Sequence, residues 1–493
     1  MQVTRFGRAM STIAAISMLA GCGGGAGSAG TSTSSISVVA ASGSSSTPAA
    51  DANGNANIEI AGCSLRERQN WAYAQLKEWY LFPDTMPASL DPTPYPTVQA
   101  YVDALTATAR DQRKDRNFTY VTSIKSEDAY YNSGSSAGFG VRLSYEKAGR
   151  VFVSESFEGA PALAAGIDRG TEILAVGTTA DNLKNVTDIL ADSGAQGFSD
   201  ALGASTAGTS RVLRVSTGGV VSNVTLTKTD YTMTPVSNRY GAKIISEGGK
   251  QYGYVNLRTF ISTADPALRD AFAQFRAAGV TDIVVDLRYN GGGLVSIADL
   301  AADLMGGNRN ATDAFEFASY RPEKQTNNTF HYFKSQPQSI APTRIAFIGT
   351  GGTASASELL INGMRPYLRN NVALIGTNTY GKPVGQIAID KTSCDDRMRI
   401  IAFSLKNADR DGDYYDGLAS KMESSCQAGD DLAYPMGDPR EASTRSALDF
   451  LQGKTCTKIG ASSGITTMSA KRPRELIVPV DASTAQRETP GLF

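Results

Sequence analysis

Apolar runs alternate with helical patterns over the second half of the chain. Residues 283–288 are mostly apolar, as in a strand that is buried on both faces. Other strands are predicted at 344–348 and 372–375, and helices at 267–278 and 297–305. Strands that alternate with helices in this way predict an α/β core, with a mainly parallel sheet, at residues 231–460.

Two different patterns precede this core. Residues 64–82 carry apolar positions at helical spacing behind a Ser64–Glu67 capping box, which predicts a small helical domain at 62–127. From 128 to 230, short strands of alternating polarity are separated by glycine turns, and this pattern predicts a β-domain.

The first residues have the pattern of an export signal. Arg5 and Arg8 precede an apolar run that is too short to span a bilayer, and the run ends at Cys22. Because residues 19–22 resemble a lipobox, we expect a signal peptide at 1–21 and a lipid on Cys22. The protein would then be anchored on the periplasmic side of the cell envelope, at the outer membrane. A simple secretory signal with a chance cysteine is the alternative.

Two further segments lack the pattern of a packed domain. Residues 22–61 are rich in glycine and serine, which predicts a flexible tether. Residues 461–493 are predicted to form an extended C-terminal tail.

Charge and cysteine content limit which functions and which cellular compartment the sequence is compatible with. The formal net charge is −1 and no stretch is strongly basic, so the sequence does not favour nucleic-acid binding. Besides Cys22, the chain has Cys63, Cys394, Cys426 and Cys456, an even number that predicts two disulfides in an oxidising compartment. Three pairings are possible, and the pair that flanks a polar insertion, Cys394 with Cys426, is preferred.

A serine and a lysine in the core are the candidate catalytic pair. Ser355 lies in a run of small residues, and Lys382 follows 27 positions later, between a glycine and a proline. A serine hydroxyl needs a base to take its proton, and a lysine can serve if burial lowers the pKa of its amine. The chain has one histidine, His331, in an aromatic run without a nearby acid, and it is the alternative base.

Three motifs of the core, in this order, resemble those of the carboxyl-terminal processing peptidases, peptidase family S41. They are Asp286-Leu287-Arg288-Tyr289-Asn290-Gly291-Gly292-Gly293, Ser355-Ala356-Ser357-Glu358 and Thr379-Tyr380-Gly381-Lys382-Pro383-Val384-Gly385-Gln386. The resemblance covers most of residues 64–460. It implies a ClpP/crotonase-like core and a serine endopeptidase that needs neither a cofactor nor a metal.

The resemblance also assigns the catalytic roles. Ser355 would be the nucleophile, Lys382 the general base and Gln386 the residue that orients the lysine. The distance from Ser355 to Lys382 is slightly longer than in relatives, which leaves Ser357 as an alternative nucleophile.

Backbone N–H groups are expected to form the oxyanion hole. By the same resemblance these belong to Ala356 and to Gly292, with Gly291 and Gly293 as alternatives to Gly292. Glycine suits a place where the backbone must approach a substrate closely.

The β-domain resembles a PDZ domain around Gly138-Phe139-Gly140-Val141. In that fold, Phe139, Gly140 and Val141 would present backbone N–H groups to a peptide carboxylate, and the adjoining strand would pair with the peptide. A β-domain that binds no peptide is the alternative.

The sequence therefore predicts a lipid-anchored serine endopeptidase that cleaves unfolded or flexible proteins near their C-termini. Its partners would be protein or peptide C-termini, and its membrane contact would be the N-terminal lipid; no oligomeric state is predicted. The alternatives are a catalytically weak peptide-binding scaffold and a small-molecule esterase or amidase. The apolar last residue, Phe493, adds a hypothesis, in which the tail occupies its own PDZ-like groove as an inhibitor or is trimmed by self-processing.

Overall fold

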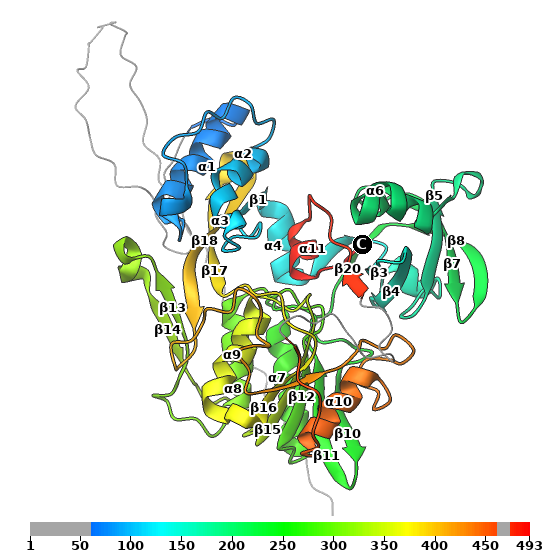
Figure 1. Ribbon diagram of the computed structural model, residues 1–493, viewed down its shortest axis with the longest axis vertical. Helices are drawn as coiled ribbons and strands as arrows, with labels where there is room; N and C mark the ends of the chain where they lie inside the picture. The colour runs from blue at the N-terminus through cyan, green and yellow to red at the C-terminus, as the bar shows by residue number, and fades with distance from the viewer. Residues whose placement is uncertain (1–60, 461–473) are drawn as a thin grey trace, which may run out of the picture. The chain divides into compact units, whose positions relative to one another are not determined.

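The computed structural model of the protein describes residues 61–460 and 474–493 (Figure 1). The predicted signal peptide, Cys22 and nearly all of the predicted tether lie outside the described residues. In the described ranges, no helix combines the length and the apolar character needed to cross a membrane.

The core is built on a six-stranded sheet in the order β10-β11-β12-β15-β16-β19. The β10–β11 pair is antiparallel, and every other neighbouring pair in this sheet is parallel. The mainly parallel sheet expected from the alternating pattern is therefore present. Its strands are β10 (Ala242–Glu247), β11 (Lys250–Asn256), β12 (Asp282–Asp286), β15 (Arg344–Gly349), β16 (Val372–Gly376) and β19 (Ser424–Gln427).

Helices cover both faces of this sheet (Figure 1). Ile283 and Val285 of β12 pack in one apolar cluster with α7, α8 and α9, whereas Val284 packs with α10 on the opposite face. Alternate residues of one strand thus enter two cores, which explains why β12 is apolar throughout. The helices are α7 (Ala264–Ala277), α8 (Val295–Met305), α9 (Ala356–Leu368) and α10 (Ala442–Leu451).

The N-terminal helices pack on a second, five-stranded sheet and share its core. Trp71 and Trp79 lie in one buried cluster with Met398 and Ile400 of β18. Residues 62–127 are therefore not an independent unit, because short helices need a second layer to bury their apolar faces. The elements are α1 (Leu65–Trp79), α2 (Val98–Leu105), α3 (Ala107–Asp111), β1 (Tyr120–Ser123), β13 (Ala314–Tyr320), β14 (Thr329–Tyr332), β17 (Val384–Lys391) and β18 (Asp396–Lys406).

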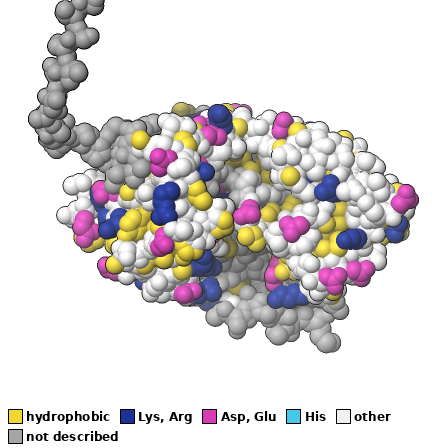
Figure 2. All heavy atoms as spheres, turned by 90° about the horizontal axis from the view of Figure 1, so that it is seen from above, with side chains coloured by type: hydrophobic (Ala, Val, Ile, Leu, Met, Phe, Trp, Pro, Cys, Tyr) yellow, Lys and Arg dark blue, Asp and Glu magenta, His cyan; other side chains and the backbone are white. Residues whose placement is uncertain are grey.

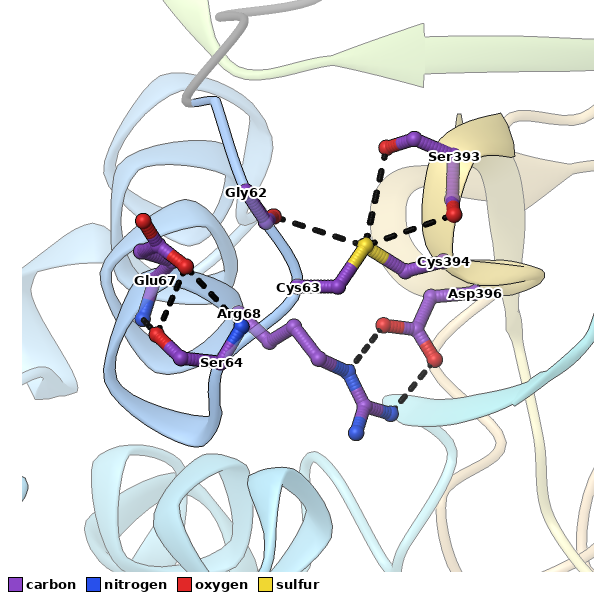
Figure 3. Close-up of a disulfide and its surroundings, with 8 residues drawn as sticks. All are labelled: Gly62, Cys63, Ser64, Glu67, Arg68, Ser393, Cys394 and Asp396. Carbon is purple, nitrogen blue, oxygen red and sulfur yellow. Dashed lines mark hydrogen bonds and ion pairs between the residues drawn. A yellow bond between two sulfur atoms is a disulfide. The ribbon is translucent and has the colours of Figure 1, made fainter.

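The disulfide pairing differs from the preferred one. Cys63 pairs with Cys394, and Cys426 pairs with Cys456. The hairpin of β17 and β18 brings Cys394 to the N-terminus of α1, where Arg68 also forms an ion pair with Asp396 (Figure 3). The predicted pairing of Cys394 with Cys426 is wrong, because Cys394 lies in the turn between β17 and β18 of the five-stranded sheet, whereas Cys426 lies on β19 of the six-stranded sheet.

A seven-stranded sheet forms the β-domain, in the order β20-β3-β4-β5-β7-β8 with β6 beside β5. Its core includes Leu143, Ile173 and Phe198. The domain consists of β3 (Val141–Glu146), β4 (Arg150–Ser156), α5 (Pro161–Ala164), β5 (Glu172–Gly177), β6 (Lys184–Asn185), α6 (Val186–Ala201), β7 (Ser210–Thr217) and β8 (Val220–Thr227).

The C-terminal tail is more structured than predicted. It contains β20 (Arg474–Leu476), which is the edge strand of the seven-stranded sheet, and α11 (Thr484–Glu488). α11 packs against α4 (Ile124–Ser133), and Figure 1 shows both above the core, between the N-terminal helices and the β-domain. The pair β2 (Ser135–Gly138) and β9 (Thr229–Thr232) and the short turns η1 (Pro83–Thr85), η2 (Ala180–Asn182), η3 (Pro322–Asn327), η4 (Arg369–Asn371) and η5 (Thr392–Cys394) complete the described elements.

Surface charges of both signs are interspersed. Figure 2 shows basic and acidic side chains scattered over one face of the molecule, with apolar side chains between them. This distribution matches the formal net charge of −1.

Candidate active site

Ser355 stands at the tight turn between β15 and α9. Its φ of +57° and ψ of −117° lie outside the regions that non-glycine residues normally adopt, and such strain persists only where the surroundings impose it. Thr353 Oγ1 donates to Leu287 O at 2.8 Å, and Ala354 N–H donates to Asn290 O at 3.0 Å. The segment that follows β12 thus fixes the turn that carries Ser355.

Arg288 anchors that segment from the inside of the protein. Its guanidinium is fully buried and lies 2.9 Å from carboxylate oxygens of both Asp286 and Glu441. A buried guanidinium requires such partners, because an unpaired charge is costly away from water. The Asp-Leu-Arg part of the first motif therefore holds the glycine turn on the core.

Gly292 touches the turn of Ser355. A Cβ added to Gly292 would lie 2.8 Å from the Ser355 Cβ and 3.0 Å from Ala356 N, and the φ of Gly292 is +118°. No side chain fits at such a distance, so this contact requires glycine. The structure therefore brings together Ser355 and both residues predicted to form the oxyanion hole.

The two predicted oxyanion donors differ in their partners. Gly292 N–H donates to Asn290 Oδ1 at 2.9 Å, so this donor is not free for a substrate oxygen. Ala356 N–H, in the first turn of α9, has no acceptor among the described residues. Gly292 in this geometry departs from its predicted role, because its N–H group already donates a hydrogen bond to the side chain of Asn290.

Lys382 is buried and points toward Gln386. Its side-chain Nζ donates to Gln386 Oε1 at 2.8 Å, and Gln386 Nε2 donates to Phe118 O. Lys382 Nζ also lies 5.1 Å from the centre of the Phe118 ring. Burial lowers the pKa of the Lys382 amine, since an ammonium loses its hydration there. This environment favours a neutral amine, which is the form that can accept a proton.

The charges around Lys382 act in both directions. After burial, the largest influence on the pKa of Lys382 is the carboxylate of Glu488, which raises it; Arg399 lowers it. Glu488 belongs to α11 of the tail, so this acid lies more than a hundred positions from the lysine in the sequence. The sequence around Lys382 gave no signal of it.

Glu358 links the serine turn to the lysine segment. It is fully buried in α9, and its carboxylate accepts hydrogen bonds from Ser355 N–H at 3.1 Å and from Lys382 N–H at 2.7 Å. Gly381 N–H and Thr379 Oγ1 donate to the same carboxylate, at 2.7 and 2.6 Å. Sequence reasoning assigned Glu358 no role, although its position three residues after Ser355 is the spacing of a capping box.

Ser357, the alternative nucleophile, has a structural contact instead. It is fully buried, and its Oγ donates to Asn290 O at 3.0 Å. Among the described residues, no hydrogen bond joins Ser355 Oγ to Lys382 Nζ, which faces Gln386. Ser355 is partly exposed whereas Ser357 is buried, so Ser355 is the more accessible serine.

His331 lies away from this group. It is on β14, and its Nε2 is 3.0 Å from Asp303 Oδ1 of α8. Phe315 packs edge-on against its ring. The structure does not bring His331 together with Ser355 and gives it partners of its own.

The predicted peptide-binding residues lie at the start of β3. Gly140 N–H and Val141 N–H donate to one oxygen of Phe493, at 2.9 and 3.1 Å. Gly140 has a φ of +73°, and a Cβ there would lie 1.9 Å from the Ala160 Cβ. Phe139 is buried in the same apolar cluster as Phe493. The three residues that were predicted to bind a peptide thus contact Phe493 of the protein's own tail.

A cavity of about 990 Å³ lies between the serine and lysine segments of the core and the C-terminal tail. Lys382, Ala354 and Gly291 line it from the core, and Arg487 and Glu488 line it from the tail. The cavity is large enough to hold a segment of polypeptide.

Comparison with known proteins agrees with this geometry. Residues 251–401, which include Ser355, Lys382 and Gln386, match the model of peptidase family S41, and residues 67–120 match the peptidase S41 N-terminal domain. A crystal structure of a protein assigned to the S41 proteases, from Bacteroides fragilis NCTC 9343, shares the fold. Its TM-score is 0.59 at 22% identity, over 78% of this chain and 97% of that one.

Two curated relatives are processing peptidases. The chain is 30% identical over 267 residues to the chloroplastic C-terminal processing peptidase of Tetradesmus obliquus, which covers 52% of this chain and 54% of the relative. It is 24% identical over 327 residues to the carboxy-terminal processing protease CtpA of Bacillus subtilis (strain 168), covering 66% and 62%. The matches thus span between about half and three fifths of the relatives' length. The resemblance to peptidase family S41 predicted from the three motifs is thus confirmed for residues 251–401, and residues 67–120 resemble the N-terminal domain of the same family.

Proposed function

We propose that the protein is a serine endopeptidase that cleaves flexible protein chains near their C-termini, with Ser355 as nucleophile and Lys382 as general base. The buried amine of Lys382, whose pKa is lowered by burial and which Gln386 orients, is the observation that carries the proposal. Glu358 supports it by fixing the backbones of Ser355 and Lys382 with one carboxylate.

In the proposed reaction, neutral Lys382 Nζ takes the proton of Ser355 Oγ while Oγ bonds to the carbonyl carbon of the substrate. The electron pair of the carbonyl moves to its oxygen, which accepts a hydrogen bond from Ala356 N–H; one such donor is worth about 10²–10³ in rate. The lysine then gives the proton to the leaving amine as the C–N bond breaks. Water hydrolyses the acyl-enzyme through the same proton transfers in reverse.

Two local movements are part of this proposal. Lys382 Nζ has to turn from Gln386 toward Ser355, and Asn290 Oδ1 has to release Gly292 N–H if glycine is to act as the second oxyanion donor. Catalytic hydrogen bonds often form only when substrate is bound. The unclosed dyad is therefore the resting form of the site.

The edge of β3 is the proposed capture site for the substrate. The N–H groups of Gly140 and Val141, at the start of this strand, both donate to an oxygen of Phe493, which supports this proposal. A peptide added to β3 gains backbone hydrogen bonds without regard to its sequence, while the cluster around Phe139 selects an apolar last residue.

The test of the nucleophile compares Ser355→Ala with Ser357→Ala. Wild type and Ser357→Ala should form a covalent adduct with a fluorophosphonate and cleave unfolded casein. Ser355→Ala should do neither, with a loss of at least about 10³-fold in rate because the nucleophile is gone. Intact mass and gel analysis give both readouts, and an adduct that survives in Ser355→Ala would refute the assignment.

The second candidate is a peptide-binding scaffold with little catalytic activity. The hydrogen bond between Lys382 and Gln386, without one between Lys382 and Ser355, favours it. A wild-type protein that binds C-terminal peptides but reacts with no fluorophosphonate would support the scaffold.

We also propose that the protein is held at the periplasmic side of the outer membrane by a lipid on Cys22. The two disulfides support an oxidising compartment, since such bonds persist there and are rare in the cytosol. The tether of residues 22–61 would let the catalytic part work at a distance from the bilayer.

A further inference from the structure

The tail, residues 474–493, fills the free edge of β3. β20 pairs antiparallel with the second half of β3. The last three residues pair with its first half, where Leu143 N–H donates to Gly491 O at 2.8 Å and Phe493 N–H donates to Val141 O at 2.9 Å. The edge to which an external peptide would add is therefore already occupied by the same chain.

The end of the tail is held as a ligand would be. One oxygen of Phe493 accepts the N–H groups of Gly140 and Val141, and its ring is 3% exposed within the core of the β-domain. A Cβ on Gly138 would lie 2.7 Å from the carboxyl carbon of Phe493. The site thus accepts a chain that ends in a large apolar residue.

The same tail reaches the glycine turn beside Ser355. Gly291 N–H donates to Glu488 O at 2.9 Å, and a Cβ on Gly291 would lie only 2.6 Å from Arg487 O. The backbone of α11 therefore contacts the loop that a substrate's backbone has to approach.

Buried polar contacts hold this arrangement. Arg142 Nη1 donates to Pro490 O at 2.6 Å, Gln486 Nε2 donates to Leu492 O at 3.0 Å, and Tyr130 OH lies 3.1 Å from Thr489 Oγ1. Arg142, Gln486 and Thr489 are all buried. Such groups have to be paired when they are removed from water, so the contacts specify this one position of the tail.

We propose that residues 474–493 are an intramolecular inhibitor that occupies the peptide-binding edge of β3 and the glycine turn of the active site, and that a substrate ending in a large apolar residue displaces it. This inference rests on the proposed function, to which it adds the class of substrate and the means of regulation.

Tethering makes this competition effective. A segment of the same chain is present at an effective concentration of the order of millimolar, so weak contacts are enough to keep it bound. If the tail is bound in about 90–99% of molecules, the apparent affinity for an external C-terminus falls about 10–100-fold. Only chains that fit the Phe493 site and reach the cavity would open the enzyme efficiently.

Glu488 adds an electrostatic component to the proposed inhibition by the tail. Its carboxylate is buried, accepts a hydrogen bond from Tyr131 OH at 3.2 Å and raises the pKa of Lys382. Because this carboxylate counteracts the lowering of the Lys382 pKa by burial, the bound tail opposes formation of the neutral base. Displacement of the tail would remove this opposition together with the steric block.

The first experiment measures peptide binding without catalysis. A fluorescent peptide with the sequence of residues 488–493 is titrated onto Ser355→Ala protein and onto the same protein with Phe493→Asp. The Asp carboxylate does not suit the apolar site, so the double variant should bind the peptide at least about tenfold more tightly. Equal affinities would overturn the proposal.

Two matched controls accompany this titration. Val480→Asp introduces the same charge in the same tail at a side chain that is 75% exposed, and it should leave the affinity unchanged. A peptide with a C-terminal amide should bind at least about tenfold more weakly than the free acid, because the carboxylate is what Gly140 and Val141 recognise. If Phe493→Asp unfolds in a thermal melt, deletion of residues 491–493 replaces it with the same expected gain.

The second experiment measures turnover in the Ser355 background. Phe493→Asp should cleave casein at least about tenfold faster than wild type, and Val480→Asp at the wild-type rate. If Phe493→Asp changes neither the turnover nor the peptide affinity, the tail is not an inhibitor, but the proposed peptidase activity is not contradicted. A different result is that no variant forms a fluorophosphonate adduct while Phe493→Asp binds the peptide more tightly. This result supports the tail as a ligand of the β3 edge and refutes the proposed peptidase function.

Intact mass separates an inhibitor from a substrate. Wild type should keep its tail during incubation at activity temperature, because the bound tail is a stable ligand. Loss of residues from the tail in wild type but not in Ser355→Ala would overturn the proposal, since the tail would then be a site of self-processing.

Discussion

At the scale of single residues, Lys382 is the group whose surroundings decide the chemistry. Burial lowers the pKa of its amine, Glu488 raises it, and Gln386 holds it by a neutral hydrogen bond. A neutral partner is significant, because a carboxylate at that position would stabilise the ammonium and remove the base.

This argument predicts the effect of Gln386→Glu. The activity of wild type should rise with pH through the lowered pKa of Lys382, as the amine loses its proton. In Gln386→Glu the new charge raises that pKa, so the rise should move to higher pH, and activity at neutral pH should fall about 10–100-fold. Profiles of kcat/KM against pH for a peptide substrate check this, and coincident profiles would contradict it.

At the scale of elements, the site is the meeting point of two loops that follow neighbouring parallel strands. β12 and β15 are adjacent, so the glycine turn after β12 lies against the serine turn after β15. Functional loops of parallel sheets gather at the carboxyl ends of the strands for this reason. Arg288 and Glu358 then hold the two loops in place from the inside.

Two glycines of these loops should respond differently to the same change. Gly292→Ala places a methyl group against Ser355 at a φ of +118°, which should lower casein cleavage at least about 10²-fold through displacement of the serine turn. Gly351→Ala meets no atom within 4 Å and should keep near-wild-type activity. The rates of the two purified variants, with circular dichroism as a check of folding, test this, and equal losses would count against close contact.

At the scale of the whole molecule, the three large sheets are connected by contacts that cross the expected domain boundaries. The N-terminal helices complete the core of the β17–β18 sheet, and the tail completes the sheet of the β-domain. The disulfide between Cys63 and Cys394 fastens the first of these contacts across 331 positions (Figure 3). A disulfide that closes a loop of that length removes much conformational entropy from the unfolded chain and so stabilises the folded protein.

The proposed anchor leads to a prediction for the whole protein in cells. Cys22→Ser should move the protein from the membrane fraction to the soluble periplasmic fraction, because the single attachment point is lost. The disulfides of Cys63 and Cys426 should form in both proteins, and peptide mapping of each fraction verifies this. A Cys22→Ser protein that stays with the membranes would disprove the lipid anchor.

The sequence by itself determined the elements of the core and the place of its chemistry. The apolar run before Asp286 predicted a strand buried on both faces, because each of its faces needs a helix layer. Ser355 and Lys382 were predicted as a catalytic pair because each lies in a local motif of small residues or glycine, and the resemblance to peptidase family S41 added Gln386. Local patterns are readable from sequence when the physical requirement acts over a few neighbouring residues.

Tertiary structure alone decided which distant segments meet. Glu358, Glu488 and the partner of Cys394 could not be identified, since their roles depend on residues that lie far away in the sequence. The helical spacing of Trp71 predicted a helix but not the sheet that buries it. The local sequence around a side chain predicts whether it will be buried or paired. The identity of its partner depends on how the whole chain packs.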